Sequence, residues 1–254
     1  MTANTAPEAA LGVLPKADGS AKYSHAGYTI TASVNGPLEA QRKDEHPNEA
    51  HVDVIVRPAA GVGATRERHL ESVLQSSLSQ IILVKNFPRG LIQIVLQIEE
   101  TPENDYVNTK LVQASVNFPI MPALFQTCIL ALLSAAVPMR ATATASVVAI
   151  VLEGEKKKTV VDPTPKQLQT AQSVHVLAFT SHDELLLAES EGDFTVQEWD
   201  EIYETAKGIC CRPQTRKSGA EMVLDEADVA GQADMRQFIR STMEGKVAAD
   251  LHWK

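Results

Sequence analysis

The sequence has little cysteine, and this scarcity excludes several classes of protein. Only Cys128, Cys210 and Cys211 occur among its 254 residues. The adjacent pair is a poor candidate for a structural bridge, because disulfide geometry requires two separated backbones that face each other. No CxxC pair and no cluster of histidine and cysteine has the spacing of metal ligands, so we expect no metal site. This usage is typical of a protein from a reducing compartment.

An excess of basic residues is also missing. The formal net charge is -9 and the pI is about 5.3. A protein that binds nucleic acid by itself usually has a basic face. Any such contact here must therefore depend on a few placed Arg and Lys residues, and the acidity favours a soluble protein that binds partner proteins.

Targeting and membrane-spanning segments are absent from the pattern as well. The N-terminal stretch MTANTAPEAALG has neither a basic region nor an apolar core of the kind that a secretory signal needs. The longest apolar run, from 123 to 139, is interrupted by Gln126, Thr127 and Ser134. It is too short and too polar to span a bilayer, so we expect an intracellular protein without a membrane anchor.

Hydrophobic residues make up 44% of the sequence, which is enough for one large globular core. Alternating or continuous apolar runs predict strands, and apolar residues at helical spacing predict three helices. Thr65 is the expected N-cap of the first helix, which should end near Phe87 and Pro88. The mixture indicates an α+β domain in which a mixed sheet packs against helices. The strands are expected at 27–35, 51–58, 91–98, 146–152, 159–161, 174–179 and 184–188, and the later helices at 122–136 and 195–211.

Three regions follow from the composition. Residues 1–10 are small and polar and are expected to form a flexible tail. Residues 11–212 form the main domain, and residues 213–254 form an extension with one helix expected from 234 to 247. The apolar strands at 91–98 and 174–179 are expected to leave sheet edges that a partner must cover.

Four segments resemble the RNase PH family in their order and spacing. They are IVRPAAGVGATRERHLE, NFPRGLIQIVLQI, LALLSAAVPM and VDPTPKQLQTAQSVHVLAF, and the resemblance covers roughly residues 11–211. It implies the ribosomal protein S5 domain 2-like fold of that family. The extension after Arg212 is not covered.

The resemblance also shows which catalytic parts are missing. Active members cleave RNA from its 3′ end with inorganic phosphate, which they hold on a Gly-Gly-Thr-Arg-like loop before the central helix. Those positions correspond to Phe118, Pro119, Ile120 and Met121. None is a glycine or a cation, and Pro119 even removes a backbone donor.

The acidic pair of the family is missing too. If Asp162 is the aspartate at the end of the strand, the two acidic positions correspond to Leu168 and Val174. The stretch PTPKQLQTAQSVH contains no carboxylate, so general acid catalysis has no candidate residue there. We therefore predict no catalytic residues and no cofactor, and we assign Asp162 to a turn or cap before Pro163.

Four arginines are the candidates for RNA contact. In active relatives, arginines at these places guide single-stranded RNA along a pore, and Arg suits phosphates because it is always charged and forks to two oxygens. The alternative is that Arg66 and Arg68 are solvated helix-start residues or subunit contacts. The candidates are Arg57, Arg66, Arg68 and Arg89.

Within the family, the sequence is similar to subunits of the eukaryotic RNA exosome ring. The resemblance implies a non-catalytic ring subunit that supports RNA decay and ribosomal RNA maturation in the nucleus, nucleolus and cytoplasm. Its implied partners are other RNase PH-like ring subunits, S1/KH-type cap subunits, a separate hydrolytic exonuclease and RNA that passes through the channel. Two alternatives stay open, namely a residual or repurposed nuclease and an interaction module unrelated to RNA.

Overall fold

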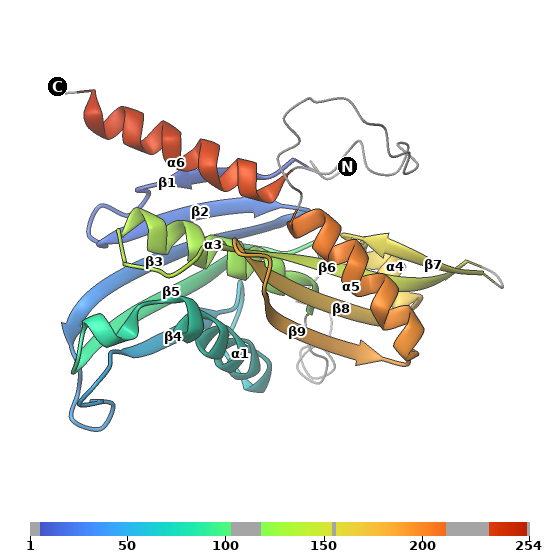
Figure 1. Ribbon diagram of the computed structural model, residues 1–254, viewed down its shortest axis with the longest axis horizontal. Coiled ribbons are helices and arrows are strands. Elements are labelled where there is room, and N and C mark those ends of the chain that lie inside the picture. The colour runs from blue at the N-terminus through green and yellow to red at the C-terminus, as the bar shows by residue number, and fades with distance from the viewer. Residues whose placement is uncertain (1–5, 103–117, 154–155, 212–233, 253–254) are drawn as a thin grey trace.

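Two β-sheets enclose a central helix in the computed structural model, which describes residues 6–102, 118–153, 156–211 and 234–252. Figure 1 shows the two sheets side by side, with the blue and teal strands in the first and the yellow and orange strands in the second. The first sheet has the order β1-β2-β3-β5-β4 and the second the order β7-β6-β8-β9. The strands are β1 (Glu8–Leu11), β2 (Gly19–His25), β3 (Tyr28–Glu39), β4 (His51–Arg57), β5 (Gly90–Glu100), β6 (Ala143–Glu153), β7 (Lys156–Val161), β8 (Ala171–Thr180) and β9 (Leu185–Gly192).

The central helix is α3, which packs against strands of both sheets. Its side chains are buried around nearly the whole circumference, as expected from its apolar sequence. The α+β class is therefore confirmed. The helices are α1 (Thr65–Ile81), α3 (Met121–Ser134), α4 (Pro165–Gln169), α5 (Val196–Cys210) and α6 (Met235–Leu251), with single 3-10 turns at Val84–Asn86 and Phe118–Ile120.

The first sheet buries one face. Along β4, Val52, Val54 and Val56 are buried while the residues between them are half-exposed, which is the alternation of a sheet with one solvated side. Helix α1 connects the parallel strands β4 and β5 and covers the buried face with Leu70, Leu74 and other apolar residues. The predicted pattern of the strand at 51–58 is thus confirmed.

The second sheet is buried on both faces. Val147 on β6 belongs to the main core with α3, whereas its neighbour Val148 belongs to a smaller core with α5. Phe179 on β8 and Ile202 on α5 also belong to this smaller core. Because β6 and β8 are buried on both faces, their sequences contain continuous apolar runs and do not alternate strictly between apolar and polar residues.

The expectation of uncovered edges at 91–98 and 174–179 was wrong. Both segments are interior strands, β5 between β3 and β4, and β8 between β6 and β9. The edge at β4 is covered from α1, because Glu71 accepts a 2.9 Å hydrogen bond from Val56 N–H and Gln75 donates a 2.8 Å bond to the Val52 carbonyl. Polar side chains of this helix therefore occupy edge groups that another strand could otherwise pair with.

The predicted bounds of the first helix were also wrong. Ala64 is the N-cap and Thr65 the first helical residue, because the Glu67 carboxylate accepts a 2.7 Å hydrogen bond from Ala64 N–H. The helix ends at Ile81 instead of near Phe87. Ile82 turns to an extended conformation and forms a bridge with Met139, which stops the helical hydrogen-bond pattern.

The N-terminal region contains more strand than the sequence predicted. Residues 8–10 of the expected tail belong to β1, which pairs with β2 in an antiparallel ladder, while residues 1–5 lie outside the described part. Strand β3 continues past Gly36 and Pro37 through a register shift between Asn35 and Leu38, where the sequence predicted that the strand would end at residue 35. In both places the strand forms through backbone hydrogen bonds to a neighbouring strand, although the local sequence has only a weak strand propensity.

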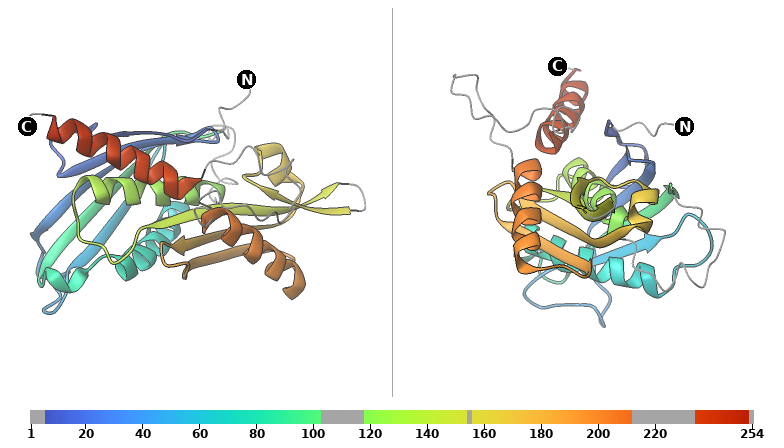
Figure 2. Two further views of the ribbon diagram at one scale, coloured as in Figure 1. Left: turned by 45° about the horizontal axis from the view of Figure 1, so that its top comes forward. Right: turned by 90° about the vertical axis from the view of Figure 1, so that its right-hand side faces the viewer.

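The C-terminal extension contributes helix α6, close to the bounds expected from its sequence. Asp234 caps it by accepting hydrogen bonds from the N–H groups of Arg236 and Gln237. Met235 and Ile239 are buried against the main core, and the helix contacts β1 and α3. Figures 1 and 2 show α6 running along the first sheet on the side away from α1. Within the described residues, no helix has the length and apolar character needed to cross a membrane.

Candidate nucleic-acid interface

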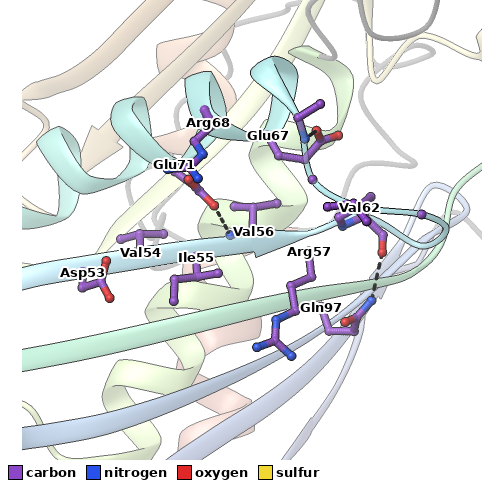
Figure 3. A pocket seen from close by; sticks show the side chains of 14 residues that line it. Asp53, Val54, Ile55, Val56, Arg57, Val62, Glu67, Arg68, Glu71 and Gln97 are labelled. Atoms are coloured by element: carbon purple, nitrogen blue, oxygen red, sulfur yellow. Dashed lines mark hydrogen bonds between the residues drawn. The ribbon is translucent and has the colours of Figure 1, made fainter. Parts of the chain in front are cut away.

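A polar groove of about 590 Å³ lies where β4 ends and α1 begins. Loop 58–64 forms one side of it, and Arg57 at the end of β4 stands opposite Gln97 of the parallel strand β5 (Figure 3). Gln97 fixes the loop by donating a 3.1 Å hydrogen bond to the Pro58 carbonyl. Arg68 from the first turns of α1 also lines the groove. The structure therefore brings two of the four predicted arginines to one place.

The carboxylates of this groove already have structural partners. Glu67 accepts from Ala64 N–H, Glu71 accepts from Val56 N–H, and Asp53 accepts a 3.2 Å bond from the Gln93 amide. Arg57 and Arg68 are exposed, and no ion pair within the described ranges engages either of them. Figure 3 shows Arg57 pointing away from α1 while Arg68 lies on the α1 side of β4. The two arginines therefore act as two separate cations and do not form one paired site for a phosphate group.

Arg66 occupies a different environment. Its side chain is only 5% exposed, and its Nε atom lies 3.3 Å from Oε1 of the buried Glu67. The first turn of α1 directs this residue inward, because Leu70 one turn later belongs to the core. In this fold the buried Arg66 side chain gives no support to a contact with RNA. Its charge partner is Glu67.

Arg89 lies at the other end of the sheet. It precedes β5, whose residues Leu91 and Gln97 pair with the first and last residues of β4. Those two positions are six residues apart, or roughly 20 Å along a strand. The Arg89 side chain is 72% exposed and its Nε atom lies 3.2 Å from Oε1 of Glu45. The predicted arginines therefore lie near both ends of β5. Their contact with RNA stays a prediction.

The positions that the sequence resemblance predicted for the phosphate-binding loop are packed into the core. Phe118, Pro119 and Ile120 form a 3-10 turn that leads into α3, and Met121 is the first residue of that helix. Phe118, Ile120 and Met121 are at most 5% exposed. Of the two acidic positions, Leu168 lies on α4 and Val174 on β8, and both are half-buried. These six residues present no charged group.

Asp162 forms a turn between β7 and α4, as the sequence predicted. Its φ of +48° is left-handed, and its N–H donates a 3.1 Å hydrogen bond to the Val147 carbonyl. It does not cap the helix, because Thr164 is the N-cap and shares a capping box with Gln167. Burial raises the pKa of the Asp162 carboxyl, and nearby His25 opposes that rise. The carboxyl faces a second cavity, which the sequence did not predict because its walls come from distant segments.

Other reactive side chains are engaged in packing. The fully buried His175 ring contacts Ser190 Oγ at 2.8 Å and Ser173 Oγ at 3.0 Å, and burial lowers its pKa. Burial raises the pKa of the Cys210 thiol, and it raises the pKa of Cys211 to about 11. Neither thiol is therefore activated as a nucleophile. In the part of the chain that is described, no group of three or more His, Cys, Asp or Glu residues could hold a metal ion.

The sequence matches a known family and several known proteins. Residues 6–138 match the model of domain 1 of the 3′ exoribonuclease family, RNase PH. The exosome complex component RRP46 of Saccharomyces cerevisiae is 30% identical over 209 residues, which cover 80% of this chain and 89% of the yeast protein. A rice relative named exosome complex exonuclease RRP46 homolog is 25% identical over 142 residues, or 56% of this chain and 53% of the rice protein.

Solved structures share the fold. The crystal structure of rice Rrp46 superimposes with a TM-score of 0.70 and 20% identity, and the match covers 95% of this chain and 98% of the rice chain. A chain of the Archaeoglobus fulgidus exosome with RNA bound to the active site gives a TM-score of 0.62 at 14% identity, over 80% of this chain and 84% of that one. The family match over residues 6–138 and the yeast relative together show that this chain belongs to the RNase PH family of 3′ exoribonucleases.

Proposed function

We propose that the chain is a non-catalytic structural subunit of an exosome core ring, where it supports 3′-to-5′ RNA processing and decay. The yeast relative is an exosome component. One observation supports the non-catalytic part: Phe118, Ile120 and Met121, at the positions predicted for the phosphate-binding loop, are buried apolar residues. A dianionic nucleophile needs cations or backbone donors in that place, and an apolar surface supplies neither.

The missing acidic pair is an independent support for inactivity. Leu168 and Val174 cannot exchange protons with a leaving group, and removing one general acid or base typically slows a reaction about 10²- to 10⁴-fold. Loss of both the anion cradle and the proton donor leaves no part of the family's chemistry at this position. The chain then contributes to RNA decay by assembly.

The proposed assembly has several kinds of partner. The chain pairs with other RNase PH-like ring subunits, S1/KH-type cap subunits sit on the ring, and a separate hydrolytic exonuclease degrades RNA that leaves the channel. The proposed places of action are the nucleus, the nucleolus and the cytoplasm. Ribosomal RNA maturation and RNA turnover are the proposed processes.

An assembly experiment tests this function. The full chain is co-expressed with the other RNase PH-like ring subunits of the same organism, and the purified product is weighed by native mass spectrometry. The expected result is a heteromer that contains one copy of this chain beside different partners. A chain that elutes alone under the same conditions contradicts the proposal.

An activity experiment tests the non-catalytic part separately. The isolated chain and the assembled ring are incubated with 3′-labelled RNA and inorganic phosphate, and nucleoside diphosphates are measured. An active RNase PH enzyme serves as the positive control. No phosphate-dependent product is expected from the isolated chain.

The second candidate function is a residual or repurposed nuclease. It is favoured by the name of the rice relative, which calls that protein an exonuclease. Phosphate-dependent release of nucleoside diphosphates from the isolated chain would establish it. The apolar filling of the phosphate position argues against that outcome.

We also propose that Arg57, Arg68 and Arg89 contact RNA in the assembled ring. Each is exposed, Arg57 at the end of β4, Arg68 on α1 and Arg89 in the turn before β5. The test is a set of rings with Arg57→Glu, Arg68→Glu or Arg89→Glu and their RNA affinity as a function of salt. A lost phosphate contact weakens binding and lowers the salt slope by about 1. Arg240→Glu is the matched control, because Arg240 is an exposed arginine of α6, the helix that runs along the first sheet on the side away from α1 (Figure 2).

A further inference from the structure

A second cavity of about 370 Å³ opens where distant segments of the chain meet. The turn between β2 and β3, the first turns of α3, the loop after β7 and the start of α6 supply its walls. We call it the Gln126 cavity, after the glutamine of α3 that lines it. Its volume falls within the usual range for small-molecule pockets, about 300–1,000 Å³. Its polar lining includes Tyr23, His25, Gln126 and Asp162.

Gln126 is the residue that singles out this cavity. Its side chain is on α3 and the residue is 1% exposed, yet neither its Nε2 nor its Oε1 atom has a hydrogen-bond partner. The large majority of buried side-chain polar atoms in proteins are paired, because an unpaired one loses its hydration without replacement. A buried amide with both atoms free on a cavity wall indicates that its partner comes from outside the fold.

Two further polar groups on these walls are held in a low-polarity environment. Burial raises the pKa of the Asp162 carboxyl, and burial together with Asp162 raises the pKa of the Tyr23 phenol. The Gln126 amide carries a donor beside an acceptor. It can therefore bind a group in which an N–H and a C=O lie next to each other.

The other described residues that line the cavity disfavour an anionic ligand and favour a flat apolar one. No Lys or Arg is among the described residues that line the cavity, so none of these residues gives a phosphate group a permanently charged partner. Pro102, Pro122, Pro163 and Pro165 line it together with Tyr23. Rigid pyrrolidine and aromatic rings present flat apolar surfaces against which a planar ring can pack.

We propose that the Gln126 cavity binds a neutral planar heterocycle through its lactam edge, the chemistry of uracil, hypoxanthine and guanine. In this arrangement Gln126 Oε1 accepts from the ring N–H and Gln126 Nε2 donates to the adjacent ring carbonyl. The recognised group is the uncharged base and not a phosphate. The proposal does not rest on the ring-subunit function, since it concerns the isolated chain.

The binding test uses ligand pairs that differ by one methyl group. Uridine and N3-methyluridine, and inosine and N1-methylinosine, are titrated into the full chain and followed by calorimetry and by ligand-observed NMR. Methylation removes the lactam donor and leaves Gln126 Oε1 unpaired, so the methylated partner of a pair should bind about tenfold more weakly. Equal affinity within both pairs overturns the proposal.

A variant of the glutamine separates binding from folding. Gln126→Met keeps the volume and removes the unpaired amide, so the melting temperature should rise by roughly 3 °C while nucleoside binding is lost. Gln172→Met is the matched control, because Gln172 also has a buried unpaired oxygen but does not line the cavity. Binding must be unchanged in this control.

The source of the base is decided by a third ligand. A short oligouridylate is compared with uridine: equal binding of the nucleoside indicates a free metabolite, and binding of the oligonucleotide alone indicates the base of an RNA. Either result supports the lactam site if Gln126→Met abolishes it. Absence of saturable binding by every ligand means that ordered water fills the cavity and overturns the proposal. The assembly experiment is unaffected by that result, so the two failures can be told apart.

Discussion

Arg236, at the start of α6, donates a 2.7 Å hydrogen bond from its guanidinium to the backbone carbonyl oxygen of Thr180, at the end of β8. The same nitrogen lies 2.8 Å from Oδ1 of Asp183 in the turn that follows. The Arg236 hydrogen bond also holds the pKa of the Asp183 carboxyl below its usual range. A residue of the C-terminal extension thereby ties α6 to the second sheet.

Arg236→Ala should loosen α6 without unfolding the domain. The loss of a charge-assisted hydrogen bond at a partly exposed site is worth about 1 kcal/mol, so backbone amides of Met235–Leu251 should exchange several-fold faster. Hydrogen exchange monitored by mass spectrometry measures this. Arg240→Ala on the same helix is the control and should leave the exchange rates unchanged. Equal rates in both variants would mean that packing of Met235 and Ile239 alone holds the helix.

Gly19→Ala should destabilise the protein by about 3 kcal/mol, in the range of overpacked cores. An added Cβ atom would lie 2.3 Å from the backbone nitrogen of Ala135 and 2.6 Å from the carbonyl oxygen of Ala131, at the end of α3. Neither backbone atom can move without shifting the central helix. Chemical denaturation measures the change. Gly208→Ala is the control, because a Cβ there meets nothing within 4 Å and Ala favours the helix by about 1 kcal/mol.

Stability should fall below neutral pH because of His175. The ordinary histidine pKa is about 6.5, and burial lowers that of His175 in the folded chain, while Glu198 opposes this shift. Between the two values the unfolded chain binds a proton that the folded chain does not, so the free energy of unfolding decreases as pH falls through 6.5. His175→Asn should flatten this decrease. The curves of the two proteins between pH 7.5 and pH 5 give the difference, and parallel curves would refute the assignment.

Thr195→Ala should lower the free energy of unfolding by about 1 kcal/mol, the typical value of a helix N-cap. The Thr195 hydroxyl accepts from Glu198 N–H at 3.3 Å, and the Glu198 carboxylate accepts from Thr195 N–H at 2.8 Å. Thr205→Ala in the middle of α5 is the matched control, where alanine should be neutral or slightly stabilising. Urea denaturation of the two variants compares them directly, and equal effects would argue against the cap.

The capping box at Thr195 and Glu198 could be predicted because its signal is local. Helix caps, turns and hydrophobic periodicity depend on residues three or four positions apart. They can therefore be recognised in the sequence itself. Helix α6 was predicted from 234 to 247 for the same reason, and the structure has it at Met235–Leu251 with Asp234 as its cap. The first helix was harder, because its end is set by the bridge between Ile82 and Met139, more than fifty residues away in the chain.

The sequence by itself determined the α+β class and the burial of the central helix, which follow from residue type and spacing. The lack of any cation or carboxylate at the six positions predicted for the family's catalytic residues is what the resemblance implies. Only the tertiary structure decided that Arg66 is buried beside Glu67, that Arg57 and Arg89 lie at opposite ends of β5, and that Gln126 faces a cavity. Periodicity states which face of an element is buried, but strand pairing and helix docking decide which distant side chains meet there.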